Sequence, residues 1–450
     1  MSTDSSSSRR IAVVGTGYVG LTTGACLAHI GHDVVCADID ADKIERLDKG
    51  EIPIVEAGLD DIVGDAVRAG RLRFVVGAAD AVRDAEVVFL AVPTPQDADG
   101  SADLSYIQAA AEEIAPLLTP GSIVVNKSTV PVGSVRSVRR VLGRDDVAVV
   151  SNPEFLREGT AVSDFLHPDR VVIGSDDPVA ARRVAELYQP LDGEILITDA
   201  ASAETIKYAA NGFLAMKISF VNAVAAMCEA VGADVASVVE GIGSDQRIGR
   251  AFLNPGPGWG GSCFPKDSRA LVAIAADHGY DFSMMRGVID VNDQQRERMI
   301  HKIAAAAGAS SGDLTGVRVG ALGLTFKAGT DDLRESPALA ILDELRALGA
   351  HVRAFDPTTV GGMDDIQRRR TESIEVVDDP VDVADDADVV VVLTEWPEFA
   401  TLDWSQLAGR MRRPHVVDTR NLLDPDRIAG LGLGYDGVGR PRRRPGRSQP

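Results

Sequence analysis

The chain has 450 residues, 45% of them hydrophobic, which is enough for two or three domains that each bury a core. Its formal net charge of −21 argues against a protein that binds nucleic acid, because nucleic-acid phosphates require a basic face. The four cysteines have neither the spacing of a metal site nor that of a disulfide framework, so we expect no metal.

The acidic surplus has an unusual make-up, because aspartate is more than twice as frequent as glutamate and lysine is rare beside arginine. We interpret this as halophilic adaptation, in which a strongly hydrated acidic surface keeps a protein in solution in a salty cytoplasm. The alternative is an acidic protein from a GC-rich genome. The scarcity of lysine also makes each lysine inside a motif a candidate functional residue.

The first ten residues are polar and rich in serine, and we expect residues 1–10 to be a disordered tail rather than a signal peptide. No stretch approaches the roughly 20 uninterrupted apolar residues that a membrane span needs. We therefore expect a cytoplasmic protein that does not bind a membrane.

A dinucleotide-binding fingerprint, Gly-x-Gly-x-x-Gly, occupies residues 15–20 between an expected strand at 11–14 and an expected helix. Its glycines allow a tight turn and let a pyrophosphate approach the helix N-terminus. Asp38 ends the next expected strand, where it would bond the ribose hydroxyls and repel a 2′-phosphate, so the pattern predicts NAD rather than NADP. Lys43 would contact the adenosine side or be an ordinary surface lysine. The expected cofactor residues of this segment are Gly15, Gly17, Tyr18, Val19, Gly20, Asp38 and Lys43.

Short Val- and Ile-rich strands alternate with amphipathic helices in the first half of the chain, which is typical of a doubly wound parallel sheet. The order recurs after residue 315, and we interpret it as a diverged internal repeat. The second half lacks the full fingerprint, and Lys327 stands at the start of its helix, where a point charge suits a phosphate. The predicted fold class is α/β, with two Rossmann-like doubly wound parallel-sheet domains joined by a long central helix.

Two loops that follow expected strands, at 92–95 and 127–131, supply hydroxyl groups and prolines. Ligands bind at the carboxyl ends of strands in open α/β sheets, so Thr94, Ser128 and Thr129 are expected to face the cofactor. An ordinary turn is the alternative for either loop.

A further segment, 152–159, follows another Val-rich strand and carries two carboxylates, Glu154 and Glu158. They would share one face if the segment is helical, since they are four residues apart. A structural ion pair is the alternative.

A long helix is expected at 203–231, and its apolar side chains on nearly all sides predict that it is buried. Lys207 and Asn211 would lie one turn apart on it. A lysine among apolar side chains costs desolvation unless it has a task, so the pair is expected to stabilise an alkoxide or hemithioacetal oxygen; snorkelling to solvent is the alternative. Such a helix would be a spine, a subunit interface or both, and we expect a homodimer.

Cys263 lies in a glycine-rich loop, 260–267, beside a hydroxyl group, Lys266 and Asp267, and these surroundings favour a reactive thiolate. A nicotinamide site alone takes two electrons from an alcohol and stops at the carbonyl. A nucleophilic thiol can hold that carbonyl as a covalent adduct, from which a second hydride leaves, so thiol and fingerprint together predict oxidation of an alcohol to a carboxylate. The other cysteines are interpreted as small buried hydrophobes: Cys26, Cys36 and Cys228.

With these motifs the sequence resembles the nucleotide-sugar dehydrogenases of the UDP-glucose/GDP-mannose dehydrogenase family over nearly its whole length. Asn254 stands where some members carry a lysine that binds the nucleotide. Segments 394–396 and 418–424 look more like the UDP-glucose branch than its relatives. The other matching segments are 15–20, 127–131, 152–159, Lys207 with Asn211, 260–267 and 323–337.

The resemblance implies that Cys263 traps the six-aldehyde as a thiohemiacetal and then a thioester. The other implied catalytic residues are Lys207, Asn211 and Asp267 for protons and the oxyanion, and Thr129, Glu154 and Glu158 for water and the sugar. The implied substrate-binding residues are Glu154, Phe155, Leu156, Arg157, Lys207, Asn211, Arg247 (from the same or a neighbouring subunit), Phe252, Gly260, Phe264, Lys327 and Arg420. Further implied cofactor residues are Thr94, Ser128, Thr129, Glu158, Lys266 and Arg334.

The implied reaction is NAD-dependent four-electron oxidation of UDP-glucose to UDP-glucuronate. Three alternatives stay open: the same reaction on GDP-mannose or UDP-N-acetylmannosamine, a two-electron hydroxyacid dehydrogenase, and a cofactor-sensing regulator without catalysis. The expected domains are an NAD-binding Rossmann domain at 11–202, a central helical and dimerisation domain at 203–312, a UDP-sugar-binding domain at 313–438 and a disordered Arg/Pro-rich tail at 439–450.

Overall fold

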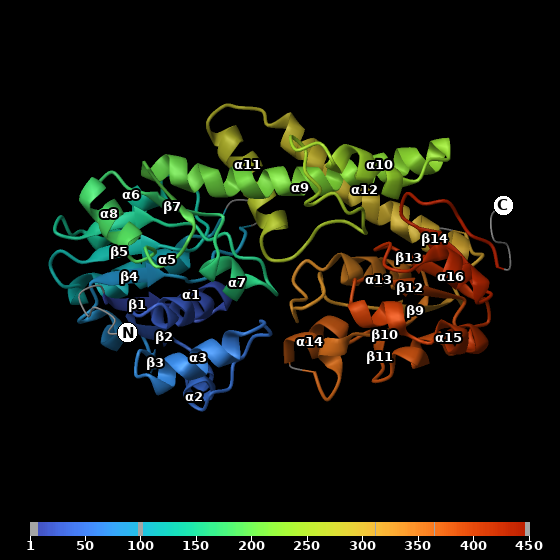
Figure 1. The fold of residues 1–450 in the computed structure, drawn as a ribbon, viewed down its shortest axis with the longest axis horizontal. Helices are drawn as coiled ribbons and strands as arrows, with labels where there is room; N and C mark the ends of the chain where they lie inside the picture. The colour runs from blue at the N-terminus through green and yellow to red at the C-terminus, as the bar shows by residue number, and fades with distance from the viewer. Residues whose placement is uncertain (1–7, 98–101, 311, 364, 446–450) are drawn as a thin grey trace. The chain divides into compact units, whose positions relative to one another are not determined.

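The computed structural model describes residues 8–97, 102–310, 312–363 and 365–445, which form two compact units (Figure 1). Unit 1 contains the described residues up to 210 together with 269–280, and unit 2 contains the rest. Two helices contribute residues to both units: α9 (Ala200–Val231) and α11 (Phe264–Asp277).

Unit 1 is built on an eight-stranded sheet with the order β3-β2-β1-β4-β5-β6-β7-β8. Its strands are β1 (Arg10–Val14), β2 (Asp33–Asp38), β3 (Leu72–Val76), β4 (Val87–Leu90), β5 (Ile123–Asn126), β6 (Ala148–Ser151), β7 (Arg170–Gly174) and β8 (Glu194–Thr198). Its helices are α1 (Tyr18–His29), α2 (Ala41–Asp48), α3 (Leu59–Arg68), α4 (Ala79–Val82), α5 (Ser105–Ile114), η1 (Ala115–Leu117), α6 (Ser134–Leu142), α7 (Ala161–Leu166) and α8 (Pro178–Glu186).

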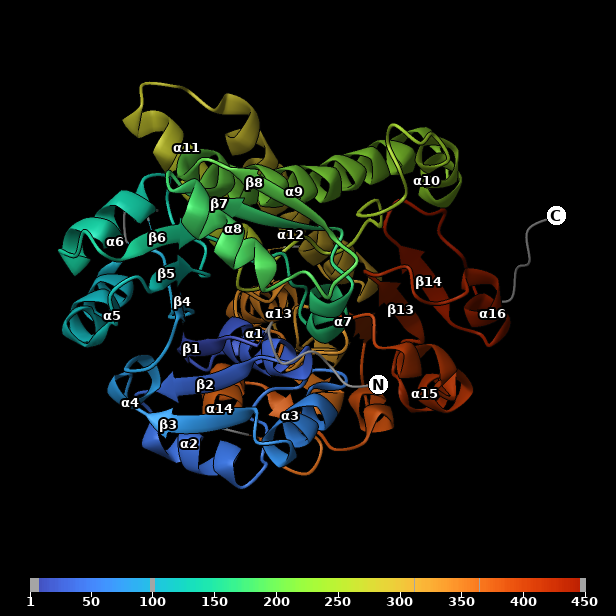
Figure 2. The same ribbon diagram turned by 60° about the vertical axis from the view of Figure 1, so that its left-hand side comes forward.

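Helices cover both faces of this sheet, and Figure 2 shows α1 and α3 on one side and α5 and α6 on the other. Strands β4 and β5 are buried along their whole length because each of their faces meets a helix layer. Neighbouring strands are parallel except at one seam, where β6 and β7 pair antiparallel through Ser151 and Gly174 alone. The seam divides the fingerprint half of the sheet from β7 and β8.

Unit 2 is built on a six-stranded parallel sheet with the order β11-β10-β9-β12-β13-β14. Its strands are β9 (Arg318–Leu322), β10 (His351–Phe355), β11 (Glu375–Val376), β12 (Val389–Val392), β13 (His415–Asp418) and β14 (Gly434–Gly437). Its own helices are α10 (Val235–Gly243), α12 (Ser283–Ala306), α13 (Pro337–Ala347), η2 (Pro357–Thr359), α14 (Asp365–Thr371), η3 (Pro380–Ala384), η4 (Pro397–Thr401), α15 (Trp404–Arg410) and α16 (Pro425–Gly430).

The strand order of the second sheet repeats that of the first six strands of unit 1, so the predicted α/β fold with two doubly wound sheets and a long helix is confirmed. The two halves differ at the end of the second strand. Asp356 follows β10 as Asp38 ends β2, but it is fully buried and accepts hydrogen bonds from the amides of Leu324 (2.7 Å) and Thr325 (3.1 Å). Because this carboxylate is buried and bonded to backbone amides, it stabilises the loop after β9 and is not accessible to a ribose.

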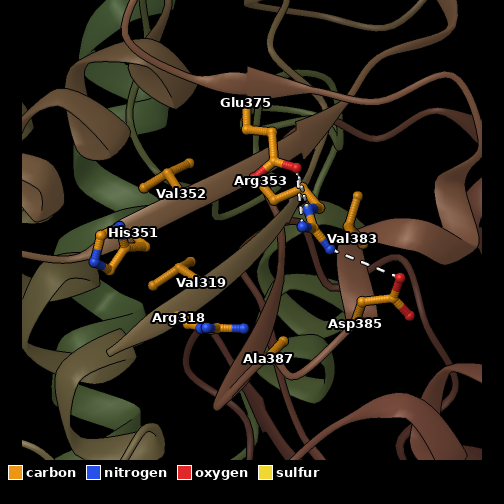
Figure 3. Close-up of a pocket in the computed structure, with 9 residues that line it drawn as sticks. All are labelled: Arg318, Val319, His351, Val352, Arg353, Glu375, Val383, Asp385 and Ala387. Atoms are coloured by element: carbon orange, nitrogen blue, oxygen red, sulfur yellow. Dashed lines mark hydrogen bonds and ion pairs between the residues drawn. The ribbon is translucent and has the colours of Figure 1, made fainter. Parts of the chain in front are cut away.

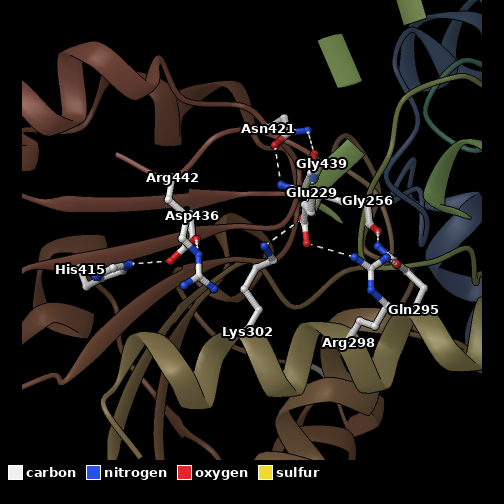
Figure 4. Close-up of polar contacts among 11 residues, drawn as sticks. Glu229, Gly256, Gln295, Arg298, Lys302, His415, Asn421, Asp436, Gly439 and Arg442 are labelled. Atoms are coloured by element: carbon white, nitrogen blue, oxygen red, sulfur yellow. Dashed lines mark hydrogen bonds and ion pairs between the residues drawn. The ribbon is translucent and has the colours of Figure 1, made fainter. Parts of the chain in front are cut away.

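Glu229 of α9 joins three parts of unit 2 (Figure 4). Its carboxylate accepts hydrogen bonds from Lys302 of α12 at 2.9 Å and from the backbone amide of Gly439 at 2.7 Å. Residues 439–443, the first part of the tail that we expected to be disordered, make further contacts: Arg442 pairs with Asp436 at 2.6 Å, and the amide of Arg443 donates to the carbonyl of Tyr435. Residues 446–450 of the expected tail lie outside the described residues, as do residues 1–7.

Helix α9 begins at Ala200 rather than at residue 203, and the expectation that it is buried is wrong along one stripe. Phe213, Phe220 and Met227 expose more than half of their surface. Their spacing of seven residues places them on one face, which composition alone does not single out.

Helix α9 is also the one described helix that is long and apolar enough to cross a membrane, with a mean hydropathy of 1.5. Its polar side chains are nevertheless used inside the protein. Glu204 is buried and accepts hydrogen bonds from the amides of Gly133 (2.6 Å) and Val135 (3.0 Å), at the start of α6. These are the contacts of a helix that packs on protein rather than on lipid.

Candidate active site

The fingerprint of unit 1 forms the turn between β1 and α1, and its geometry requires glycine. Gly15 has a φ of +98°, and a side chain there would meet the carbonyl oxygen of Ala91 at 2.6 Å. A side chain at Gly20 would meet the carbonyl oxygen of Gly15 at 1.9 Å. Gly17 caps α1 without a side chain, so the first helical amides, beginning with Tyr18 and Val19, lack a side-chain acceptor. This is an open helix N-terminus that fits a pyrophosphate.

Asp38 lies at the end of β2 beside this turn. Its carboxylate accepts hydrogen bonds from the amide (2.9 Å) and hydroxyl (2.7 Å) of Thr16 and pairs with Lys43 at 3.2 Å. Burial alone would raise the pKa of Asp38, but the Thr16 hydrogen bonds and the Lys43 charge outweigh it and hold that pKa below its usual value. The carboxylate is thus ionised at neutral pH, and Lys43 is its partner rather than a free surface lysine.

Glu56, in the loop before α3, is a buried carboxylate that sequence reasoning missed. Its side chain hydrogen-bonds the hydroxyl group of Tyr18 and accepts from the amides of Gly159 (2.7 Å) and Ala161 (2.8 Å). Burial raises the pKa of Glu56. It therefore ties the fingerprint helix to the end of segment 152–159. No spacing in the sequence signals this link, because the partners are about a hundred residues apart.

The two expected loops do follow β4 and β5, whose carboxyl ends lie side by side in the sheet. The hydroxyl group of Ser128 donates to the carbonyl of Val92 at 2.6 Å, so the loops are joined to each other. Thr129 is buried, and Thr94 is partly exposed. Lys127, which precedes them, is buried as well, and its only signal in the sequence is the scarcity of lysine.

Segment 152–159 is not helical, so Glu154 and Glu158 do not share a helix face. The chain turns instead, because the Glu154 carboxylate accepts the amide of Leu156 at 2.7 Å and Gly159 takes a φ of +83°. Arg157 is exposed and pairs with Asp164.

Glu154 forms a buried ion pair with Lys207 of α9, with 2.9 Å between Oε1 and Nζ. Both side chains expose about a twentieth of their surface. Burial raises the pKa of Glu154, but the Lys207 charge and hydrogen bond outweigh it, so the net shift is downward. Nζ of Lys207 also lies 5.4 Å from the ring centre of Phe155. Lys207 does not snorkel to solvent; it is held inside unit 1.

In unit 2 the cysteine loop packs closely on the segment after β9. A side chain at Gly260 would meet the carbonyl oxygen of Glu335 at 2.0 Å, and one at Gly261 would meet the ring of Phe326 at 2.8 Å. Cys263 is partly exposed, with the Ser262 hydroxyl 3.5 Å from its sulfur. Helix α11 begins directly after Cys263, and the positive end of a helix favours a thiolate.

Asp267, in the first turn of α11, is fully buried. Its carboxylate accepts hydrogen bonds from Nδ2 of Asn211 and from Nζ of Lys266, both at 2.6 Å. Its own amide donates to the carbonyl of Cys263 at 2.9 Å. Asp267 therefore links the start of the unit 2 part of α9 to the cysteine loop, and Lys266 helps to fix that loop.

Arg420, just after β13, is a further charged residue in this part of unit 2. Its guanidinium donates to the carbonyls of Leu393 (2.7 Å) and Phe326 (3.0 Å) and pairs with Glu395 at 3.1 Å. Gly256 lies next to it, since a side chain there would be in van der Waals contact with Nη1, at 3.6 Å. This part of unit 2 thus gathers the cysteine loop, the Phe326 segment and an arginine at the carboxyl ends of β9, β12 and β13.

The remaining expected site residues of unit 2 are placed as follows. Phe252 has a φ of +62°, which strains a non-glycine residue, and its ring lies 6.1 Å from that of Phe264. Lys327 is partly exposed beside Phe326. Arg247 and Arg334 are exposed and pair with Asp245 and Asp332.

The other three cysteines are buried and free, as predicted, and burial raises the pKa of Cys26 and Cys36 to about 12. Among the described residues no group of three or more His, Cys, Asp or Glu side chains is placed to hold a metal ion.

A hollow of about 210 Å³ lies at the opposite, amino-terminal edge of the second sheet (Figure 3). It is lined by the starts of β9 and β10, with Arg353 paired to Glu375 at 2.9 Å and facing Asp385. Because ligands of doubly wound sheets bind at the carboxyl edge, it is not a candidate for the active site.

Sequence models of the UDP-glucose/GDP-mannose dehydrogenase family match three parts of the chain: the NAD binding domain at residues 9–192, the central domain at 201–294 and the UDP binding domain at 320–425. Among curated proteins, a UDP-glucose 6-dehydrogenase of Rhizobium meliloti is 48% identical over 96% of this chain and its own full length. The UDP-glucose 6-dehydrogenase TuaD of Bacillus subtilis is 44% identical over 96% of this chain and 94% of its own.

Solved structures give the same result. A UDP-glucose dehydrogenase from Pyrobaculum islandicum is 36% identical, with a TM-score of 0.87 over 98% of this chain and all of its own. A UDP-D-ManNAc dehydrogenase from Pyrococcus horikoshii is 27% identical, with a TM-score of 0.83 over 96% of this chain and 99% of its own. The chain is therefore similar over 96–98% of its length to proteins named as dehydrogenases of nucleotide sugars.

Proposed function

Because the chain belongs to the UDP-glucose/GDP-mannose dehydrogenase family, we infer that it oxidises UDP-glucose to UDP-glucuronate with NAD. Full-length relatives at 44–48% identity carry this activity in their names. One observation carries the assignment of the chemistry: Cys263 lies at the start of a helix whose first turn buries Asp267 against Asn211. A two-electron hydroxyacid dehydrogenase or a cofactor-sensing regulator has no need of such a thiol.

The reaction removes two hydrides from one carbon. NAD, when bound, supplies the acceptor for each hydride. In the first step the C6 hydroxyl gives up its proton while the C6 carbon gives up a hydride, which leaves an aldehyde. The thiolate of Cys263 adds to this aldehyde, and the resulting thiohemiacetal loses the second hydride to give a thioester. Water then cleaves the C–S bond, which releases the carboxylate and returns the thiolate.

We propose that Lys207 and Asp267, assisted by Asn211, hold protons and stabilise the oxyanion in these steps. The buried ion pair of Glu154 and Lys207 supports this role. A neutral lysine at this position can accept a proton, and a charged lysine can donate a hydrogen bond to an oxyanion. Thr129, Glu154 and Glu158 are proposed to position the sugar and the hydrolytic water.

The fingerprint turn fits the pyrophosphate of NAD. The Asp38 carboxylate, which already contacts Thr16 and Lys43, fits a hydroxyl group of the ribose. The remaining cofactor and substrate contacts are proposals that rest on position in the fold. They are Gly15, Gly17, Tyr18, Val19, Gly20, Thr94, Ser128, Lys266 and Arg334 for NAD, and Phe155, Leu156, Arg157, Arg247, Phe252, Gly260, Phe264, Lys327 and Arg420 for the UDP-sugar.

We also propose the domain limits 11–202, 203–312 and 313–438, a cytoplasmic location and a homodimer. The dimer is supported by the stripe of Phe213, Phe220 and Met227, since soluble chains rarely expose a contiguous apolar face without a partner.

The test is the yield of NADH. Purified protein with limiting UDP-glucose and excess NAD should form two NADH per sugar, because both hydrides leave the same carbon. A yield of one NADH per sugar would contradict the covalent step, because only one hydride would have left the carbon. Rates on GDP-mannose and UDP-N-acetylmannosamine, measured in parallel, decide the alternative of another nucleotide sugar: a higher kcat/KM on either of them would contradict the choice of UDP-glucose.

A further inference from the structure

Lys127 follows directly on β5 and exposes only 5% of its surface. Its Nζ donates to Oδ1 of Asn152 at 3.1 Å and lies 5.7 Å from the ring centre of Tyr188. Among the residues that the structure describes, no carboxylate lies within 4.0 Å of this Nζ, whereas Lys207 has Glu154 at 2.9 Å. A buried ammonium group without an ion-pair partner of its own is costly, so its retention indicates a task.

Asn152 is the residue through which Lys127 acts on the backbone. Its Oδ1 also accepts the hydroxyl group of Tyr188 at 2.6 Å, and its Nδ2 donates to the carbonyl of Val172 at 2.8 Å. These bonds cross the seam where β6 and β7 pair through one residue pair only. The side-chain cluster of Lys127, Asn152 and Tyr188 therefore fixes the start of segment 152–159, in which Glu154 stands two residues later.

Lys127 also belongs to a buried cluster of charges. The ionisable groups that act on it are Glu154, Lys207 on α9 and the phenol of Tyr188. Arg170 of β7 stacks on the ring of Phe155, with 3.9 Å to the ring centre. Burial lowers the pKa of Lys127 to about 8; Glu154 acts against this shift and Lys207 adds to it. Two cations therefore share one carboxylate, and the cluster carries a net positive charge when both lysines are protonated.

We propose that Lys127 is a positioning residue of the oxidation: its charge sets the proton balance of the Glu154–Lys207 pair, and its hydrogen bond to Asn152 fixes the segment that carries Glu154. The proposal rests on the proposed function, since it assigns Lys207 to proton transfer. A like charge beside Lys207 disfavours its protonated form, so Lys207 accepts a proton from the C6 hydroxyl more readily. The same charge keeps Glu154 ionised.

Two substitutions and one control test this. Lys127→Met removes the charge and fills a similar volume, a change that protein interiors often tolerate. Lys127→Arg keeps the charge. Tyr188→Phe removes a hydrogen bond to the same Asn152 and leaves the charge in place. For each we would measure kcat against pH with saturating UDP-glucose and NAD.

In Lys127→Met the acid limb of the pH profile should move to higher pH by about one unit, because Lys207 and Glu154, which both act in their deprotonated forms, each lose a positive neighbour. On the acid side this is roughly a tenfold loss of rate. Lys127→Arg and Tyr188→Phe should keep the wild-type acid limb even where their rates fall. A purely structural role predicts a lower rate at every pH with an acid limb that does not move.

An unmoved acid limb in a Lys127→Met protein that still melts cooperatively and binds NAD would overturn the proposal, and so would an equal shift in Tyr188→Phe. If the methionine variant does not fold, Lys127→Gln, which retains a donor to Asn152, is measured and judged by the same two criteria. The wild-type yield of NADH distinguishes a failure of the role of Lys127 from a failure of the proposed function. Two NADH per UDP-glucose with an unmoved acid limb contradicts only the role of Lys127, whereas a yield of one contradicts the proposed function.

Discussion

At the scale of single residues, the sequence indicates a side chain where its partners are local and misses it where they are distant. Cys263 and Asp267 are four residues apart, so their loop is a visible motif, and the structure joins them through a backbone hydrogen bond of 2.9 Å. The task of Lys127 depends on Asn152 and on Tyr188, 25 and 61 positions farther along the chain. No local pattern encodes that meeting, because strand order in the sheet brings the three together.

Replacing Cys263 by serine should lower the overall rate by about 10³-fold or more, because a serine hydroxyl is a far weaker nucleophile than a thiolate at neutral pH. The dissociation constant for NAD, measured by titration of protein fluorescence, should stay within about twofold of the wild type, since the fingerprint turn is not altered. Ser262→Ala is the matched control in the same loop: it keeps the thiol and removes only the hydroxyl 3.5 Å away, so it should retain most of the rate. Near-normal turnover by Cys263→Ser would contradict the role of the thiol.

At the scale of elements, the sheets were predictable because strands buried on both faces appear as short apolar runs, as in β4 and β5. Strand β8 was not predicted although it carries the apolar run 195–197, and the structure leaves that run partly exposed at the edge of the sheet. Helix α9 shows the limit of composition. Its apolar residues predict burial. Whether Phe220 is buried, however, depends on what packs against its face of the helix, and in the single chain that side chain stays more than half exposed.

Placing a charge on the exposed stripe of α9 tests whether a second copy covers it. Phe220→Glu should convert a dimer into a monomer, because a buried carboxylate without a partner costs several kcal/mol at an interface. Light scattering during gel filtration measures the mass. Val179→Glu on α8 is the matched control, since Val179 is 56% exposed and lies off the stripe, and it should leave the mass unchanged. A wild-type monomer, or a Phe220→Glu dimer, would contradict the dimer proposal.

At the scale of the whole molecule, two similar sheets have diverged in what they offer a ligand. In unit 1 the acid after the second strand, Asp38, stays partly exposed beside an open helix N-terminus. In unit 2 its counterpart Asp356 is sealed inside its own loop, and the surroundings supply Lys327 and Arg420 instead. The repeat was predictable from the order of strands. The burial of Asp356 was not, because it depends on hydrogen bonds to Leu324 and Thr325 across the turn.

The net charge of −21 makes salt a determinant of stability, and two effects of salt oppose each other. Screening weakens exposed ion pairs such as Arg68–Asp65, but each of these contributes less than about 1 kcal/mol. Screening also relieves the repulsion among the surplus carboxylates, which acts over the whole surface and grows with net charge. We expect the second effect to prevail, so Tm in about 2 M KCl should exceed Tm in dilute buffer by about 5 °C or more, with a parallel gain in activity. Scanning calorimetry measures Tm, and sorbitol at the same osmolality is the control for general exclusion effects. Equal Tm and equal activity in dilute buffer and in KCl would contradict halophilic adaptation and leave genome composition as the explanation of the aspartate-rich surface.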